Sequence, residues 1–122
     1  DKAFAEKLTP YKNLHVRVSI KGTSQEEYHK LTDAIPESYE LPFKGLKYLI
    51  DAGVSCNACV MISFSDANGI KRVEEKLYGV HPGLLKSFEK EHITPFPKVA
   101  QRLAKNGLKP NSIAFKGKVV NL

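Results

Sequence analysis

KYLIDAGV, residues 47–54, places a helical apolar face, a glycine and a further apolar residue in direct succession. The same order recurs in QRLAKNGL, residues 101–108. Glycine commonly ends a helix because it adopts left-handed backbone angles without steric cost. A helix, a glycine and then a strand, repeated along the chain, are typical of βαβ units. The sequence therefore predicts an α/β protein made of strand–helix repeats with a mainly parallel sheet.

The clearest strand signal lies upstream of this stretch. Residues 14–20, LHVRVSI, alternate apolar and polar side chains without a break, which predicts a strand. Ser24 followed by Glu27 fits a capping box and predicts a helix directly after it. Weaker signals predict the end of a helix in residues 1–12 and a loop at 32–41. The remaining predicted elements are helices at 25–31, 42–52, 70–78 and 84–93, a further helix that Pro95 and Pro97 introduce and Asn106-Gly107 ends, and strands at 54–64 and 112–115.

Size and composition indicate one globular domain. The chain has 122 residues, of which 42% are hydrophobic and 26% charged, close to the average for folded domains. No apolar run approaches the roughly 20 residues that a spanning helix needs, so no membrane association is expected. Two cysteines and no signal peptide favour a reducing cytoplasm. The chain begins without an initiator methionine, as an internal piece of a longer protein or a trimmed product would.

The net charge of +6 favours an anionic partner or substrate. The alternative is that these lysines lie beside glutamates on solvated helix faces. Lys and Arg form no block of five or six along the chain, so a basic nucleic-acid-binding arm is not predicted.

A candidate binding site lies on the first predicted strand. Arg17, Ser19 and Lys21 are two residues apart, so they share one face near the carboxyl end, where parallel α/β proteins bind ligands. Arg17 and Lys21 could hold a carboxylate or phosphate, and Ser19 a hydroxyl group. The alternative is a polar strand face that simply meets solvent. Ser63 and Met61, on the second strand, could line a cavity beside this row, or simply take part in ordinary packing.

The two cysteines form the only potential metal or redox motif. Cys56 and Cys59 are three residues apart within a predicted strand, so their thiols should point to opposite faces. No second pair and no suitably spaced histidine accompanies them, which favours buried, unreactive cysteines over a metal site. The four histidines are scattered, and no complete set of catalytic residues is predicted.

One long segment resembles a known family. Residues 15–65, HVRVSIKGTSQEEYHKLTDAIPESYELPFKGLKYLIDAGVSCNACVMISFS, resemble the fourth and fifth strand–helix units of radical S-adenosylmethionine (SAM) enzymes, most closely an archaeal-type group related to the molybdenum-cofactor biosynthesis enzyme. In the similar glycyl-radical activases, the fourth strand carries the sequence pattern acid-x-Lys-Gly, which contacts SAM. Serine replaces the acid here. The matching residues are Ser19, Ile20, Lys21 and Gly22, then Tyr28, Lys30, Leu31 and Thr32.

The resemblance implies that residues 1–115 form about three units of a partial (β/α)₆ TIM-like barrel, with residues 116–122 as an appended tail. In that family a [4Fe–4S] cluster cleaves SAM, and both the cluster motif and the main SAM-binding turn lie upstream of the matching strand. This chain would supply barrel wall and contacts to SAM or an anionic substrate through Arg17, Ser19, Lys21 and Ser63. It would be inactive without the missing N-terminal half of the barrel.

A second hypothesis keeps the chain self-contained. Three parallel strands leave exposed sheet edges, which folded proteins seldom leave uncovered. The chain could close these edges as a homodimer, a small binding module in which Arg17 and Lys21 hold an anionic ligand or a nucleic acid.

Overall fold

A computed structural model describes all 122 residues and confirms the α/β class. Its centre is a parallel sheet of three strands in the order β1-β2-β3, where β1 is Val16–Lys21, β2 is Cys56–Met61 and β3 is Glu89–Glu91. The other elements are α1 (Lys2–Lys7), α2 (Gln25–Thr32), the 3₁₀ helix η1 (Pro36–Glu40), α3 (Leu41–Asp51), α4 (Ala67–Val80), α5 (Leu84–Ser87), α6 (Pro97–Lys105), β4 (Ser112–Phe115) and β5 (Lys118–Asn121).

The sequence signals for α2 and α3 act as predicted. The hydroxyl oxygen of Ser24 accepts a hydrogen bond from the Glu27 amide at 3.1 Å, which caps α2. Pro42 lies in the first turn of α3, where its missing amide hydrogen costs nothing. Gly53 follows α3 with a φ of +75°, and this left-handed residue turns the chain directly into β2.

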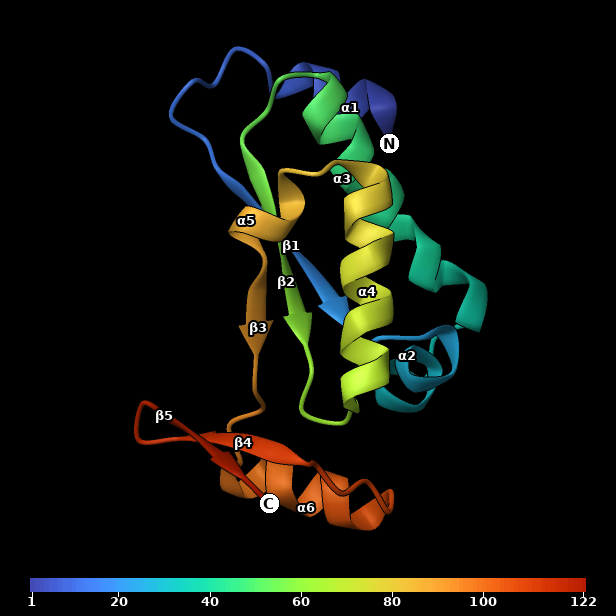
Figure 1. Ribbon diagram of the computed structural model, residues 1–122, viewed down its shortest axis with the longest axis vertical. Helices are drawn as coiled ribbons and strands as arrows, with labels where there is room; N and C mark the ends of the chain where they lie inside the picture. The colour runs from blue at the N-terminus through green and yellow to red at the C-terminus, as the bar shows by residue number, and fades with distance from the viewer.

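The hydrophobic core lies between one face of the sheet and helices α3 and α4 (Figure 1). The even-numbered residues of β1 and β2 point into this core because side chains alternate along a strand. Leu46 of α3 and Leu77 of α4 are completely buried there. The core also contains Ile20, Tyr39, Phe43, Ala58, Val60, Ile62, Val73 and Leu84.

The opposite face of the sheet is polar and is exposed over β1 and β3. The central strand β2 is nevertheless buried on both faces. On the polar side its cover comes from charged side chains of β1 and β3 that meet above it, not from a second layer of helices.

The C-terminal third departs from the prediction. A helix at 84–93 is wrong, because α5 ends at Ser87 and the chain then extends into β3. The strand at 112–115 is confirmed, but its main partner is β5, antiparallel. Residues 116–122, expected as a tail, contain the hairpin turn and β5. Lys116 and Gly117 have φ values of +48° and +75°, which a tight hairpin turn requires.

The first helix also differs in detail. Phe4 and Tyr11 are exposed, and Ala5 is the α1 residue that packs against Leu49 and Val54. None of the helices combines the length and the apolar character needed to cross a bilayer.

Candidate functional site

The polar face of the sheet brings together the residues predicted on β1. Arg17, Ser19 and Lys21 lie opposite Asn57, Cys59 and Met61 of β2 in the parallel register. Glu89 and Glu91 of β3 lie opposite Cys59 and Met61 in turn. The three strands therefore present one continuous polar surface, which we call the open face. Its residues are Arg17, Ser19, Lys21, Asn57, Cys59, Met61, Glu89 and Glu91.

Arg17 spans the open face from one edge strand to the other. Its Nη2 and Nε atoms donate to Oε2 of Glu89 at 2.6 and 3.0 Å. A longer contact of 3.6 Å joins Nη2 to Oε1 of Glu91. Because β1 and β3 are separated by β2, this guanidinium group covers the central strand and ties the two edges together.

Lys21 and Ser19, the other two predicted site residues on β1, remain available to a ligand. Lys21 has one long contact, 4.0 Å from Nζ to Oε2 of Glu91, and its side chain is 45% exposed. Ser19 is exposed, and its hydroxyl group makes no hydrogen bond within the chain. An ammonium and a hydroxyl group on neighbouring positions of one face suit a carboxylate or phosphate oxygen.

Cys59 lies beneath the Arg17–Glu89 ion pair. Its thiol donates to Oε2 of Glu89 at 2.8 Å, and the residue is 2% exposed. The pKa of Cys59 is raised, first because burial disfavours the thiolate and then because Glu89 accepts its hydrogen. The hydrogen bonds from Cys59 and Arg17 lower the pKa of Glu89, and the same pairing raises the pKa of Arg17. The carboxylate therefore stays ionised and the thiol protonated, a poor arrangement for a nucleophile.

A second polar group closes the amino-terminal end of the open face. Nδ2 of Asn57 donates to the Ser87 carbonyl at 3.0 Å, which fixes the amide orientation. Oδ1 of Asn57 therefore accepts from Nε2 of His15 at 2.8 Å. Ser55 then donates to Nδ1 of the same ring at 2.6 Å. All of these hydrogen-bond partners belong to the protein itself, so the amino-terminal end of the open face has a structural role.

Ser63 lies apart from the β1 row. It is fully buried, and its hydroxyl oxygen accepts from the Ile93 amide at 2.7 Å. Its carbonyl accepts from the Asn111 amide at 2.6 Å. Ser63 thus anchors the C-terminal residues to the carboxyl end of β2.

A cavity near the carboxyl ends of the strands lies apart from the β1 row. It measures about 330 Å³ and lies between α2 and the loop after α6, and none of the four predicted site residues lines it. Its lining residues are Ser24, Glu26, Glu27, Lys30, Leu31, Phe64, Gly107, Leu108 and Lys109.

The residues present do not fit an iron–sulfur cluster. Cys56 packs toward the helices while Cys59 lies on the open face, so the predicted divergence of the two thiols is confirmed. No three His, Cys, Asp or Glu side chains gather closely enough to hold a metal ion. A three-cysteine cluster site would therefore need ligands from outside these 122 residues.

The sequence signals found the β1 half of the open face and missed the β3 half. Glu89 and Glu91 fall in a segment whose apolar spacing favoured a helix, so their partnership with Arg17 was not visible in the sequence. Comparisons with protein-family models, with curated protein sequences and with solved structures found no match to this chain.

Proposed function

We propose that this chain is part of the wall of a (β/α)₆ TIM-like barrel in a radical SAM enzyme, and that its open face looks into the barrel. The observation that carries this proposal is the one-sided sheet. The three parallel strands follow one another in sequence order, and α3 and α4 pack on one face. Sequential order with an outer helical layer is the arrangement of a β/α barrel. A doubly wound sheet reverses its order and places helices on both faces.

The free edges of the sheet support the same conclusion. β1 and β3 each pair with β2 alone, so each of them has one unpaired edge. Unpaired edges of this kind are normally covered or paired. In a barrel both edges continue into further strands, which another segment of polypeptide would provide.

The open face offers groups that suit one end of SAM. Ser19 and Lys21 carry the matching positions of the family's strand motif, and both have donors free for the carboxylate of an amino acid or for an anionic substrate. SAM, when bound, supplies a one-electron oxidant after reduction by a cluster. The role of this chain is to orient the ligand through Lys21 and Ser19, with Arg17 holding the two edge strands in position.

The deciding experiment is to read the coding sequence upstream of Asp1. We expect an open frame that encodes a CxxxCxxC motif and a Gly-Gly-Glu-like turn. The longer product should then contain iron and sulfide and form 5′-deoxyadenosine from SAM, and Lys21→Ala should weaken SAM binding with the iron content unchanged. A start codon directly before Asp1, or strong SAM binding by the 122 residues alone, would contradict the proposal.

The same free edges favour a second candidate, a small homodimeric binding module in which two copies pair through β1 or β3. Sedimentation equilibrium separates the two. A dimer that persists at all accessible protein concentrations would favour the module, whereas a monomer that binds no SAM agrees with the barrel proposal.

A further inference from the structure

The net charge of this protein is confined to one end of the chain. All thirteen Asp and Glu residues lie at or before Glu91, together with thirteen of the nineteen Lys and Arg. Residues 92–122 hold the other six cations and no acidic side chain, so the whole +6 belongs to them. We call these residues the C-terminal unit. Its cations are Lys98, Arg102, Lys105, Lys109, Lys116 and Lys118.

The C-terminal unit forms a separate layer across the carboxyl ends of the sheet strands (Figure 1). It comprises α6 and the β4–β5 hairpin. Its attachments to the carboxyl end of β2 include two hydrogen bonds to Ser63, from the Asn111 amide to the carbonyl at 2.6 Å and from the Ile93 amide to the hydroxyl oxygen at 2.7 Å. These contacts hold it beside the end where parallel sheets bind ligands.

Three of these cations form a row on α6. Lys98, Arg102 and Lys105 are spaced by four and three residues, which places them on one face of the helix. All three are exposed, and none of the six cations of the unit makes an ion pair. Elsewhere in the chain, cations such as Lys47 and Lys76 pair with neighbouring carboxylates. An unpaired cationic row suits a polyanion.

The orientation of α6 favours nucleic acid over a membrane surface. A helix that lies in a bilayer must offer its apolar face to lipid. Here Val99 and Leu103, the large apolar residues of α6, are half-buried within the protein, and the cationic row faces solvent. The face that α6 presents to a partner is therefore one of charge.

Two exposed aromatic rings accompany the cations. Phe96, just before α6, is 65% exposed, and Phe115, on β4, is 51% exposed. Nζ of Lys116 lies 5.4 Å from the centroid of the Phe115 ring. Cations that follow a phosphate backbone, combined with rings on which bases stack, are the usual means of binding single strands. We propose that the C-terminal unit binds single-stranded nucleic acid, with phosphates on the α6 row and a base on Phe96 or Phe115.

The test is fluorescence anisotropy of a labelled single-stranded RNA of about 20 nucleotides, titrated with the 122-residue chain at several salt concentrations. The triple variant Lys98→Gln/Arg102→Gln/Lys105→Gln should lose about 100-fold in affinity near 0.1 M salt, and its log–log salt slope should fall by about two. Phe115→Ala should lose about tenfold with the slope unchanged, because stacking releases no counterions.

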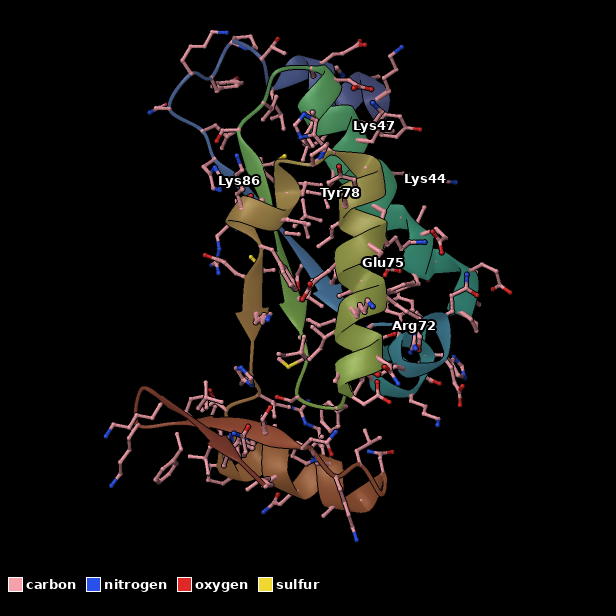
Figure 2. The ribbon with its side chains drawn as sticks, in the orientation of Figure 1. Lys44, Lys47, Arg72, Glu75, Tyr78 and Lys86 are labelled. Atoms are coloured by element: carbon pink, nitrogen blue, oxygen red, sulfur yellow. The ribbon has the colours of Figure 1, made fainter.

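A matched control removes the same charge elsewhere. Lys44→Gln/Arg72→Gln/Lys86→Gln also neutralises two lysines and one arginine, at exposed sites on α3, α4 and α5 outside the C-terminal unit (Figure 2). This variant should keep nearly all of the affinity, and circular dichroism should show each variant folded.

Three results would overturn the proposal. They are no RNA binding at about 0.05 M salt, an equal loss from both triple variants, or binding to phosphatidylserine vesicles in place of RNA. The proposal does not depend on the radical SAM assignment, because the measurement needs neither SAM nor a cluster.

Discussion

Residue by residue, the open face shows how far period-two alternation predicts a site and where it stops. Alternation alone placed Arg17, Ser19 and Lys21 on one face, and the structure confirms it. The partner carboxylate of Glu89 could not be predicted, because it lies 72 residues away and meets Arg17 only once β3 has paired with β2. The pairing therefore depends on tertiary structure that the local sequence does not encode.

The Arg17–Glu89 pair predicts a pH dependence of stability. The pKa of Glu89 lies below its ordinary value of 4.5, mainly because Cys59 and Arg17 donate hydrogen bonds to it. Its stabilising contribution is complete above the pKa of the unfolded chain and is lost as the pH falls through the folded pKa. Glu89→Gln should therefore flatten the fall in urea midpoint below about pH 5.

Glu75→Gln is the matched control for this prediction. Glu75 lies on α4, away from the open face (Figure 2), and makes no ion pair. This variant should keep the acid limb of the wild-type curve. Identical curves for the wild type and Glu89→Gln would show that the pair has no influence on folding.

Ser63 makes a different prediction, about stability alone. Ser63→Ala would leave the part-buried Ile93 amide without the acceptor that it now has at 2.7 Å, so unfolding should become easier by about 1–3 kcal/mol. Ser19→Ala provides the comparison, because that hydroxyl is exposed and has no protein partner. Urea titration measures both. An equal effect at the two serines would be inconsistent with Ser63 as an anchor.

Among the elements, those with strong local signals were predicted and those made by pairing were not. Ser24 and Gly53 set the limits of α2 and α3 through capping and turn chemistry, so their sequences suffice. β3 has the sequence Glu-Lys-Glu, which has little strand propensity. It is extended because β2 offers it a paired edge and Arg17 neutralises its carboxylates, and neither cause lies within its own residues.

The stability of α3 should depend on one narrow face. Leu46 is completely buried, whereas Leu41 on the same helix is 62% exposed. Leu46→Ala should therefore cost about 2–5 kcal/mol in the free energy of unfolding. Leu41→Ala should change it by less than about 0.5 kcal/mol. Denaturant titration of the two variants tests which face of α3 holds it to the sheet, and a large loss at Leu41 would mean that the helix packs the other way.

For the molecule as a whole, two features could not be recognised from the sequence. The cations are spread along the chain, so no basic block is visible, yet every acidic residue lies before His92. The one-sided sheet could not be recognised either. The sequence of β2 does not show whether its second face is covered by a helix or by an ion pair between neighbouring strands.

The free edge of β1 makes a prediction for hydrogen exchange. The Val16 amide bonds to Ser55 and the Gly22 amide to Met61, so in a parallel ladder the even-numbered amides of β1 point to β2 and the odd-numbered ones point outward. In the 122-residue chain, Arg17, Ser19 and Lys21 amides should exchange rapidly while Val18 and Ile20 are protected.

Exchange measured by NMR then separates the architectures. Cys59 and Val60, in the central strand, serve as protected references in every case. If a further barrel strand pairs with β1, protection of the odd-numbered amides should appear only when the longer polypeptide is present. If two copies pair through β1, protection should appear in the 122-residue chain and rise with its concentration. Protection that is present at every dilution of a monomer would mean that β1 is covered within the chain, and the one-sided sheet would then not be evidence for a barrel.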